Sequence, residues 1–334
     1  MPRILSTGQA INEALAIAME SDPDVILLGE DVAGGGAREA EGTDEMGGVL
    51  GTTKGLVKRF PERVLDTPIS EMGILGTAVG AAATGLRPVA ELMFIDFLGV
   101  CLDPLLNQAA KLRYMFGGKA RVPLTVRTVC GAGMRAAAQH SQSLYWMTAG
   151  IPGLKTVIPS NPADAKGLLL AAIRDDDPVV FCEAKGVLMQ RGDVPEGDYT
   201  LPIGQAKVVR AGGDVTLVGF GATVAVALAA ADALAQDGTQ AEVLDLRSLA
   251  PLDEAAILGS LEKTGRLVVV DESTPRCGIA SDVAALCVDK GFDFLNAPVR
   301  RVTAPHTPVP FAAILEDAFR PDAAKVVAAV REMG

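Results

Sequence analysis

One glutamate, Glu71, carries the clearest chemistry in this chain of 334 residues. It lies in the segment DTPISEMG (residues 66–73), where a proline-containing extended stretch gives way to small residues. Residues 74–86 are almost all Gly, Ala, Val, Leu and Thr, which predicts a helix that packs closely on all sides and begins near Glu71. A carboxylate that enters an apolar interior at a helix start can exchange a proton with a bound heterocycle. A capping acid in the first helical turn explains Glu71 equally well.

His140 is one of only two histidines and lies in AAAQHSQSLY (residues 136–145), a polar island between apolar segments. Its polar neighbours favour a cleft-lining role at least as much as a buried structural one. The adjacent Ser141 invites a hydrolase interpretation, but neighbouring side chains cannot easily face each other and no nucleophile elbow is present. His306 lies in APHTPVPF (residues 304–311), where three prolines predict an ordered surface turn, with partner recognition as the alternative.

A second motif imitates a dinucleotide-binding fingerprint. Gly219 and Gly221 follow a predicted strand and open a predicted helix, and Asp245 ends the next strand. The third glycine of the fingerprint is missing, so a tight turn explains the two glycines without a ligand.

The elements that must position these residues alternate between strands and helices, which predicts a mostly parallel sheet with crossover helices. In the first part of the chain we expect strands at 25–29, near 64, 89–93, 122–128, 155–158 and 179–183, and helices at 8–21, 97–115 and 162–174. The alternation breaks between 185 and 204 and then resumes. In the second part we expect strands at 215–219, 241–244, 267–271 and near 299, with helices at 223–236, 253–263, 278–289 and from 322.

The composition favours an α/β protein and argues against some partners. Hydrophobic residues make up 49% of the chain and aromatic residues only 4%, as in closely stacked helices and parallel strands. A formal charge of -11 argues against nucleic acid or an anionic membrane surface as a partner. The five scattered cysteines predict reduced thiols in apolar surroundings, and we find neither a leader nor an apolar run of ~18 residues, so we expect a cytoplasmic protein.

Four long stretches resemble a known family in the right order. They are residues 66–118, 136–145, 151–183 and 264–282, and they are similar to the beta subunit of the thiamine diphosphate-dependent decarboxylating component of 2-oxoacid dehydrogenase complexes. GEDVAGGG (29–36), GGVLGTTKGL (47–56), FIDFLGVCLD (94–103), RYMFGGKA (113–120) and PHTPVPF (305–311) most resemble its acetoin dehydrogenase branch. The resemblance implies an N-terminal transketolase-like pyrimidine-binding domain at 1–190, a linker at 191–205 and a smaller C-terminal α/β domain at 206–334.

The resemblance also implies roles for individual residues. Glu71 would hydrogen-bond the aminopyrimidine ring of thiamine diphosphate and promote proton loss from the thiazolium carbon. Phe97 would stack on that ring and Ile69 would border it, although Phe97 also suits a plain core position. His140 would bind and protonate the carbonyl intermediate or receive the lipoyl group.

Two further sets of residues match weaker family features. Glu30 and Asp103 match acids of a polar channel between paired active sites, although each also suits the end of an element. The backbone carbonyls of four residues match a potassium site of some relatives: Leu124, Ala172, Asp175 and Asp177. Carbonyl oxygens suit a hard cation, and an ordinary helix end explains the same turn.

The chain lacks the Gly-Asp-Gly loop and downstream Asn that hold diphosphate and magnesium in the family. The resemblance therefore implies an alpha subunit that holds the magnesium, in a two-alpha two-beta heterotetramer, and a dihydrolipoyl acyltransferase as a further partner. Two departures leave the substrate open between acetoin, pyruvate and a branched 2-oxoacid: Gly150 replaces a histidine, and AKGVLMQ follows FCE where relatives carry Lys-Xaa-Leu-Tyr. A non-catalytic interaction subunit and a nicotinamide oxidoreductase built on Gly219 remain as alternatives.

Overall fold

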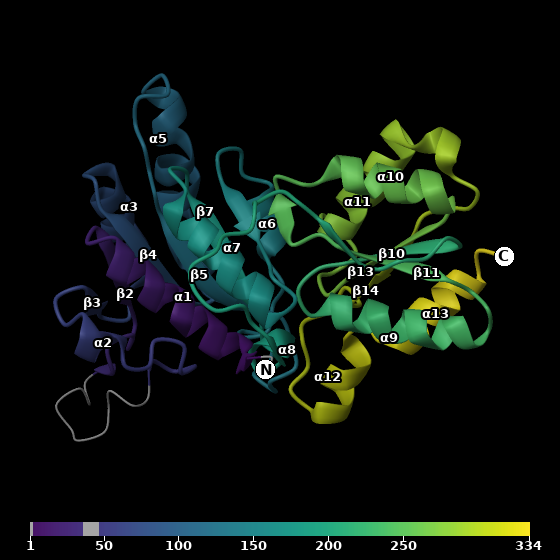
Figure 1. Ribbon diagram of the computed structural model, residues 1–334, viewed down its shortest axis with the longest axis horizontal. Coiled ribbons are helices and arrows are strands. Elements are labelled where there is room, and N and C mark those ends of the chain that lie inside the picture. Colours follow the sequence, from purple (N-terminus) through teal and green to yellow (C-terminus); the bar gives the residue numbers. More distant parts are fainter. Residues whose placement is uncertain (1–2, 36–46) are drawn as a thin grey trace.

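The computed structural model describes residues 3–35 and 47–334. Two α/β halves lie side by side, with the N-terminal half in purple to teal and the C-terminal half in green to yellow (Figure 1). This arrangement confirms the predicted α/β class. Residues 36–46 lie outside the described part of the chain.

The first half is built on a seven-stranded sheet whose inner pairs are all parallel. The strand order is β12 (Ser248–Ala250), β6 (Lys155–Val157), β7 (Val179–Ala184), β5 (Thr125–Cys130), β4 (Arg87–Phe94), β2 (Val25–Gly29) and β3 (Val64–Asp66). The edge strand β12 comes from the second half of the chain and pairs antiparallel with β6. The sequence pattern did not predict this strand, because three residues are too few to show a period.

Helices cover both faces of this sheet. On one face α1 (Thr7–Ser21) packs against α7 (Pro162–Arg174), and on the other lie α3 (Glu71–Ala83), α4 (Leu98–Asp103) and α5 (Ala110–Met115). Helix α1 begins at a capping box, in which the Ser6 hydroxyl accepts from the Gln9 N–H and the Gln9 amide accepts from the Ser6 N–H. Three short helices complete this half: α2 (Leu56–Arg59), α6 (Tyr145–Ala149) and α8 (Lys185–Leu188).

Two helix predictions are wrong in instructive ways. Helix α3 does not pack on all sides, because Met72 and the small residues Gly73, Gly76, Thr77 and Gly80 form an exposed face. The long helix expected at 97–115 is broken into a 3-10 turn at Ile95–Phe97, α4, a π-helix at Pro104–Ala109 and α5. Cys101 leaves helical geometry with φ of -126°, and Pro104 follows it without an N–H to donate.

The second half holds a five-stranded sheet in the order β14 (Arg300–Thr303), β13 (Leu267–Asp271), β10 (Val215–Gly219), β11 (Ala241–Asp245) and β9 (Lys207–Arg210). Helices α9 (Thr223–Gln236) and α13 (Ala323–Arg331) cover one face, and α10 (Glu254–Thr264) and α11 (Ile279–Lys290) cover the other. Several elements match the predicted ranges exactly, while α12 (Ala313–Phe319) was not predicted. One hydrophobic cluster runs from α3 through the first sheet to α10 and α11, so the two halves share a core.

Segments at the two ends of the first half are paired. Strand β8 (Arg191–Asp193) runs antiparallel to β1 (Ile4–Ser6), within the stretch predicted to be a linker. Four of the five cysteines are buried and free as predicted, whereas Cys277 is exposed on a loop. No described helix has the length and hydropathy needed to cross a membrane.

Candidate active site

Glu71 is the first residue of α3, at the helix start predicted from the sequence. It is half-buried rather than enclosed in an apolar interior, because the small-residue face of α3 is open. Its N-cap, Ser70, makes no side-chain cap hydrogen bond. Ile69 precedes this turn and is 73% exposed, so its side chain is available to a ligand or a second chain.

Glu30 lies in the electrostatic field of Glu71. Burial raises the pKa of the Glu30 carboxyl, and the negative charges of Asp31, Glu71 and Glu91 raise it further. Glu30 and Glu71 therefore interact electrostatically, although the family resemblance implied different roles for them, Glu30 in a polar channel and Glu71 at the pyrimidine ring. Asp103 ends α4, is exposed and accepts a hydrogen bond from the Asn107 amide at 2.6 Å. No contact described for Asp103 joins it to Glu30, so its place in a channel stays a prediction.

Phe97 and His140 lie together in an aromatic cluster completed by Phe94. The ring centroids of Phe97 and His140 are 5.4 Å apart, and those of Phe94 and His140 are 5.1 Å apart. Phe94 and Phe97 meet edge to face at 5.9 Å. Each of the three contacts is T-shaped, the geometry that aromatic pairs prefer. The two residues that the sequence proposed separately thus share one wall.

Cys101 connects this cluster to Glu71. Its thiol donates a hydrogen bond to the Phe97 carbonyl at 3.4 Å. Burial raises the pKa of Cys101 to about 12, and the charge of Glu71 contributes to the same direction. Helix α4 therefore contacts both sides, because it packs against α3, which begins at Glu71, and its Cys101 thiol bonds to the Phe97 backbone.

The loop that carries His140 is tied to the C-terminal half by acids. The Ala132 N–H donates to Glu272 at 2.9 Å and the Gly133 N–H donates to the fully buried Glu316 at 2.8 Å. Arg135 forms ion pairs with Glu316 and with Asp317. Burial raises the pKa of Glu272. The position of His140 therefore depends on both halves of the chain.

Two charged residues close to His140 were not singled out from the sequence. The Asp96 carboxylate, next to Phe97, accepts from the backbone N–H of Gln142 at 3.1 Å and from its side-chain amide at 3.0 Å. The buried Lys185 ammonium donates to the His140 carbonyl. Asp96 lies inside the FIDFLG motif, and Lys185 lies in the AKGVLMQ segment that departs from the family pattern. Both residues lie in sequence motifs named above, but only the fold shows that they lie close to His140.

A buried ion network lies on the α1 and α7 face of the sheet. Arg127 of β5 pairs with Glu91 of β4 and with Glu183 of β7, each at 2.8 Å, and donates to the Thr52 hydroxyl at 2.9 Å. Burial raises the pKa of Glu183 although Arg127 opposes that shift. Charged residues inside otherwise apolar strands were the sequence signal for this network.

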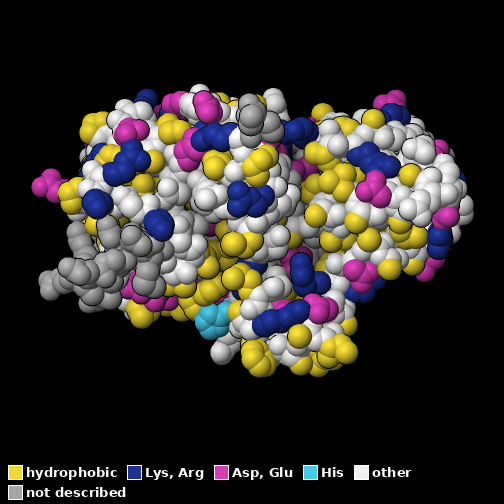
Figure 2. Space-filling model, turned by 60° about the horizontal axis from the view of Figure 1, so that its bottom comes forward, with side chains coloured by type: hydrophobic (Ala, Val, Ile, Leu, Met, Phe, Trp, Pro, Cys, Tyr) yellow, Lys and Arg dark blue, Asp and Glu magenta, His cyan; other side chains and the backbone are white. Residues whose placement is uncertain are grey.

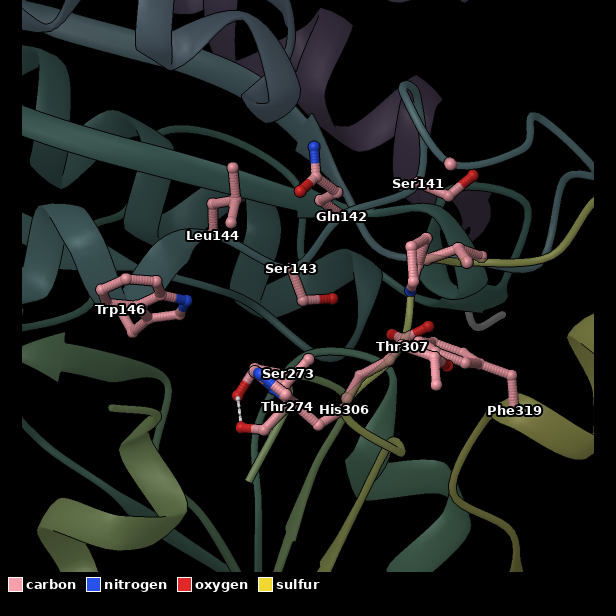
Figure 3. Close-up of a pocket in the computed structure, with 14 residues that line it drawn as sticks. Ser141, Gln142, Ser143, Leu144, Trp146, Ser273, Thr274, His306, Thr307 and Phe319 are labelled. Atoms are coloured by element: carbon pink, nitrogen blue, oxygen red, sulfur yellow. Dashed lines mark hydrogen bonds between the residues drawn. The ribbon is translucent and has the colours of Figure 1, made fainter. Parts of the chain in front are cut away.

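A cavity of about 320 Å³ lies between the halves beside the His140 loop (Figure 3). Ser141, Gln142 and Trp146 line it from the N-terminal half, and Ser273, Thr274 and His306 line it from the C-terminal half. The buried Ser141 hydroxyl has no hydrogen-bond partner among the described residues. The imidazole of His140 is not part of the lining, so the cavity neighbours the aromatic cluster rather than containing it.

The predicted cation carbonyls lie at the C-terminus of α7 and the start of β5 and β7. The Leu124 carbonyl accepts from the Val179 N–H at 2.9 Å, and the Asp175 carbonyl accepts from Arg87 at 3.1 Å. The Ala172 carbonyl accepts from the Asp175 N–H at 3.2 Å. Each oxygen has a second lone pair, but a guanidinium already lies at one of them, so a potassium site here stays a prediction.

The nicotinamide alternative fails on the geometry of its glycines. A side chain at Gly221, which has φ of +52°, would meet Ile158 at 2.8 Å, so close packing requires the glycine. Asp245 is fully buried and accepts from the Ser160 hydroxyl at 2.5 Å and from the Arg247 N–H at 3.0 Å. Its oxygens are therefore committed to the fold and not to a ribose.

The residues around α3 and the aromatic cluster fit one end of an aminopyrimidine cofactor. A carboxylate without a hydrogen bond in the described residues, an aromatic ring and an imidazole form an acceptor, a stacking surface and a proton donor. The described residues hold no group of three His, Cys, Asp or Glu side chains arranged to bind a metal ion.

The two α/β halves and this site define a member of the transketolase family. Residues 4–190 match the model of the transketolase pyrimidine binding domain, and residues 204–326 match that of the transketolase C-terminal domain, so the chain belongs to this family. The solved structure of a split-gene transketolase, an inactive beta4 tetramer, has a TM-score of 0.77 at 24% identity over 98% of each chain, which shows the shared fold.

Among curated proteins the chain is similar to subunits of oxidoreductases. It is 61% identical to the beta subunit of acetoin:2,6-dichlorophenolindophenol oxidoreductase of Bacillus subtilis, over 100% of this chain and 98% of the relative. The corresponding subunit of Cupriavidus necator is 55% identical, over 99% and 98%. The beta subunit of 2-oxoisovalerate dehydrogenase of Bacillus subtilis is 43% identical, over 99% and 98%. The predicted family resemblance is confirmed.

Proposed function

We propose that the chain is the beta subunit of a thiamine diphosphate-dependent oxidoreductase that cleaves acetoin. The observation that carries the proposal is the aromatic cluster of Phe97 and His140 beside α4, the helix that packs against α3, which begins at Glu71. Two relatives named for acetoin, at 61% and 55% identity against 43% for a 2-oxoisovalerate relative, favour this substrate.

In the proposed reaction the bond between the carbonyl and carbinol carbons of acetoin breaks. The carbinol half leaves as acetaldehyde, and the carbonyl half forms an acetyl thioester with one sulfur of lipoamide. The lipoamide disulfide takes up the two electrons, and its second sulfur receives the proton of the carbinol hydroxyl as a thiol. The bound cofactor would supply the nucleophilic carbon and the electron sink.

The chain's own residues would then have separate tasks. Glu71 would accept or share a proton at the ring nitrogen of the pyrimidine. Phe97 would hold the ring plane, and Ile69 would border it. His140, fixed by Phe94 and Phe97, would donate a hydrogen bond to the substrate carbonyl oxygen and later meet the lipoyl sulfur.

A second chain would complete the site. The open face of α3 consists of Gly73, Gly76, Thr77 and Gly80 beside Met72, a surface on which another helix can pack closely. Large exposed hydrophobic side chains lie at the end of α5 (Tyr114, Met115 and Phe116) and around α12 (Phe311, Ile314 and Leu315). In Figure 2 hydrophobic side chains lie scattered among charged and other side chains over the visible face. An alpha subunit in a two-alpha two-beta assembly would bury such surfaces and supply magnesium and diphosphate ligands.

The remaining parts of the proposal follow from the same family. The pyrimidine-binding unit would span residues 1–190, the linker 191–205 and the second domain 206–334. The carbonyls of Leu124, Ala172, Asp175 and Asp177 would hold potassium, a dihydrolipoyl acyltransferase would accept the acetyl group, and the complex would work in the cytoplasm.

Co-expression with the alpha subunit tests the proposal. The purified complex is assayed with acetoin, pyruvate and a branched 2-oxoacid, using 2,6-dichlorophenolindophenol as electron acceptor. We expect the highest kcat/KM with acetoin. A higher kcat/KM with either 2-oxoacid would make that 2-oxoacid the substrate in place of acetoin. No turnover with any of the three compounds would reject the enzymatic proposal.

A further inference from the structure

Lys185 is a buried lysine whose ammonium reaches the backbone of His140. It begins α8 directly after β7 and is only 5% exposed. Its Nζ donates a hydrogen bond to the His140 carbonyl oxygen and lies 4.8 Å from the centroid of the Phe94 ring. A desolvated cation over an aromatic face is a favourable contact.

Lys185 therefore contacts both the backbone of His140 and the Phe94 ring that packs against its imidazole. Phe94 packs edge to face against His140 and against Phe97, so the ammonium fixes the ring that forms the floor of the cluster. Its hydrogen bond holds the main chain at His140 itself. Neither contact brings the ammonium into the cavity beside the loop, which lacks lysine or arginine in its lining.

Asp96 completes the arrangement from the opposite side. Its carboxylate holds the backbone and side-chain amides of Gln142, two residues after His140. Burial lowers the pKa of Lys185, and the largest charge acting against that shift is that of Asp96, ahead of Cys130, Glu316 and Glu272. Residues 140 and 142 are thus held by opposite charges from two different elements.

We propose that Lys185 is a positioning residue for His140, which fixes the imidazole against Phe94 and Phe97 through the His140 carbonyl and the Phe94 ring. The part of this inference that concerns catalysis depends on the function proposed above for His140. The structural part does not, and each part has its own measurement.

Histidine-selective NMR of the full chain measures the position of the imidazole directly. His140 and His306 are the only histidines, so two pairs of ring C–H signals are expected and His306→Gln assigns them. We expect Lys185→Met to move the His140 signal away from its ring-current-shifted position and to leave His306 unchanged. We expect Lys185→Arg to restore most of the shift, because arginine keeps the cation and donors.

Lys166→Met is the matched control. Lys166 is also buried, its ammonium lies 4.9 Å from the Tyr199 ring centroid, and it donates to Glu13 and to the Pro195 carbonyl. An unchanged His140 signal in Lys185→Met overturns the proposal. An equal change in Lys166→Met also overturns it, because the effect would then reflect general loosening of the fold.

The holoenzyme with its alpha subunit tests the catalytic part. We expect Lys185→Met to lower acetyl transfer to lipoamide by roughly tenfold to a hundredfold, as for other small misplacements of a reacting group. Proton exchange at the thiazolium carbon should stay at the parent rate, since Lys185 contacts neither Glu71 nor Phe97 directly. Arginine should rescue transfer. A parent complex without turnover would reject the proposed function while leaving the NMR result to decide the positioning role.

Discussion

Phe97 and His140 meet edge to face with ring planes at 85°, although one belongs to a turn after β4 and the other to a loop after β5. The two strands are parallel neighbours, so their carboxyl ends deliver both rings to the same edge of the sheet. Glu71 begins α3, which packs against α4, and the Cys101 thiol of α4 donates to the Phe97 carbonyl. The proposed roles of these three side chains can be separated by experiment.

Replacing Glu71 with Gln should stop proton exchange at the thiazolium carbon in the assembled complex. An amide cannot take up and return the proton, and loss of a general acid–base group lowers rates about 10²- to 10⁴-fold. The thermal midpoint should not change, because Glu71 is half-buried and makes no side-chain hydrogen bond in the described structure. Hydrogen–deuterium exchange by NMR measures the step. If the variant exchanges as fast as the parent, Glu71 serves only as an acidic residue at the start of the helix.

Replacing His140 with Ala should damage acetyl transfer far more than proton exchange. The contacts described for His140 are with Phe94, Phe97 and Lys185, and none is with Glu71, the proposed proton acceptor. Gly150, exposed at the end of α6, offers no second imidazole to take over the task. Single-turnover transfer to lipoamide is the measurement, with His306→Ala as the matched control. Equal transfer by the two variants would return His140 to a structural role.

Arg127→Met should destabilise the fold by about 3–5 kcal/mol, because it leaves the buried Glu91 and Glu183 without a cation. Arg174→Met is the control, since its pair with Asp198 is exposed and such pairs contribute about 0–1 kcal/mol. Urea unfolding of both variants gives the difference. A loss of stability at Arg127 no larger than at Arg174 would mean that the network is not needed to hold these strands.

Local sequence patterns predicted many of the helices and strands and the position of Glu71. The other features of the site depend on contacts between segments that are distant in sequence. Strands such as β2 and helices such as α7 follow from apolar runs and caps, and Glu71 was placed at its helix start. The open face of α3 could not be predicted, because small residues on every side show no amphipathic period. The hydrogen bonds that hold the loop before His140 are made to Glu272 and Glu316, which are far away in sequence, so no local pattern could predict them.

The fully buried Asp245 should make stability fall as the pH rises from about 4 to 6. Burial raises its pKa to about 6, above the value of about 3.9 expected in the unfolded chain. Between these values the folded state binds more protons than the unfolded state, so the slope of the unfolding free energy against pH is negative. A difference of two pH units corresponds to about 3 kcal/mol as an upper value. Asp245→Asn should remove this contribution, so its stability relative to the parent should increase across that window.

Asp198→Asn provides a control of the opposite sign. A hydrogen bond from Arg174 lowers the pKa of the exposed Asp198 carboxyl, so its contribution is present at neutral pH and is lost as the pH falls. Urea unfolding at several pH values from 4 to 7 compares the parent with both variants. If the gap between the parent and Asp245→Asn stays constant with pH, the pKa of Asp245 is the same in the folded and unfolded states, and the raised pKa is rejected. The bonds from Ser160 and Arg247 would then offset desolvation.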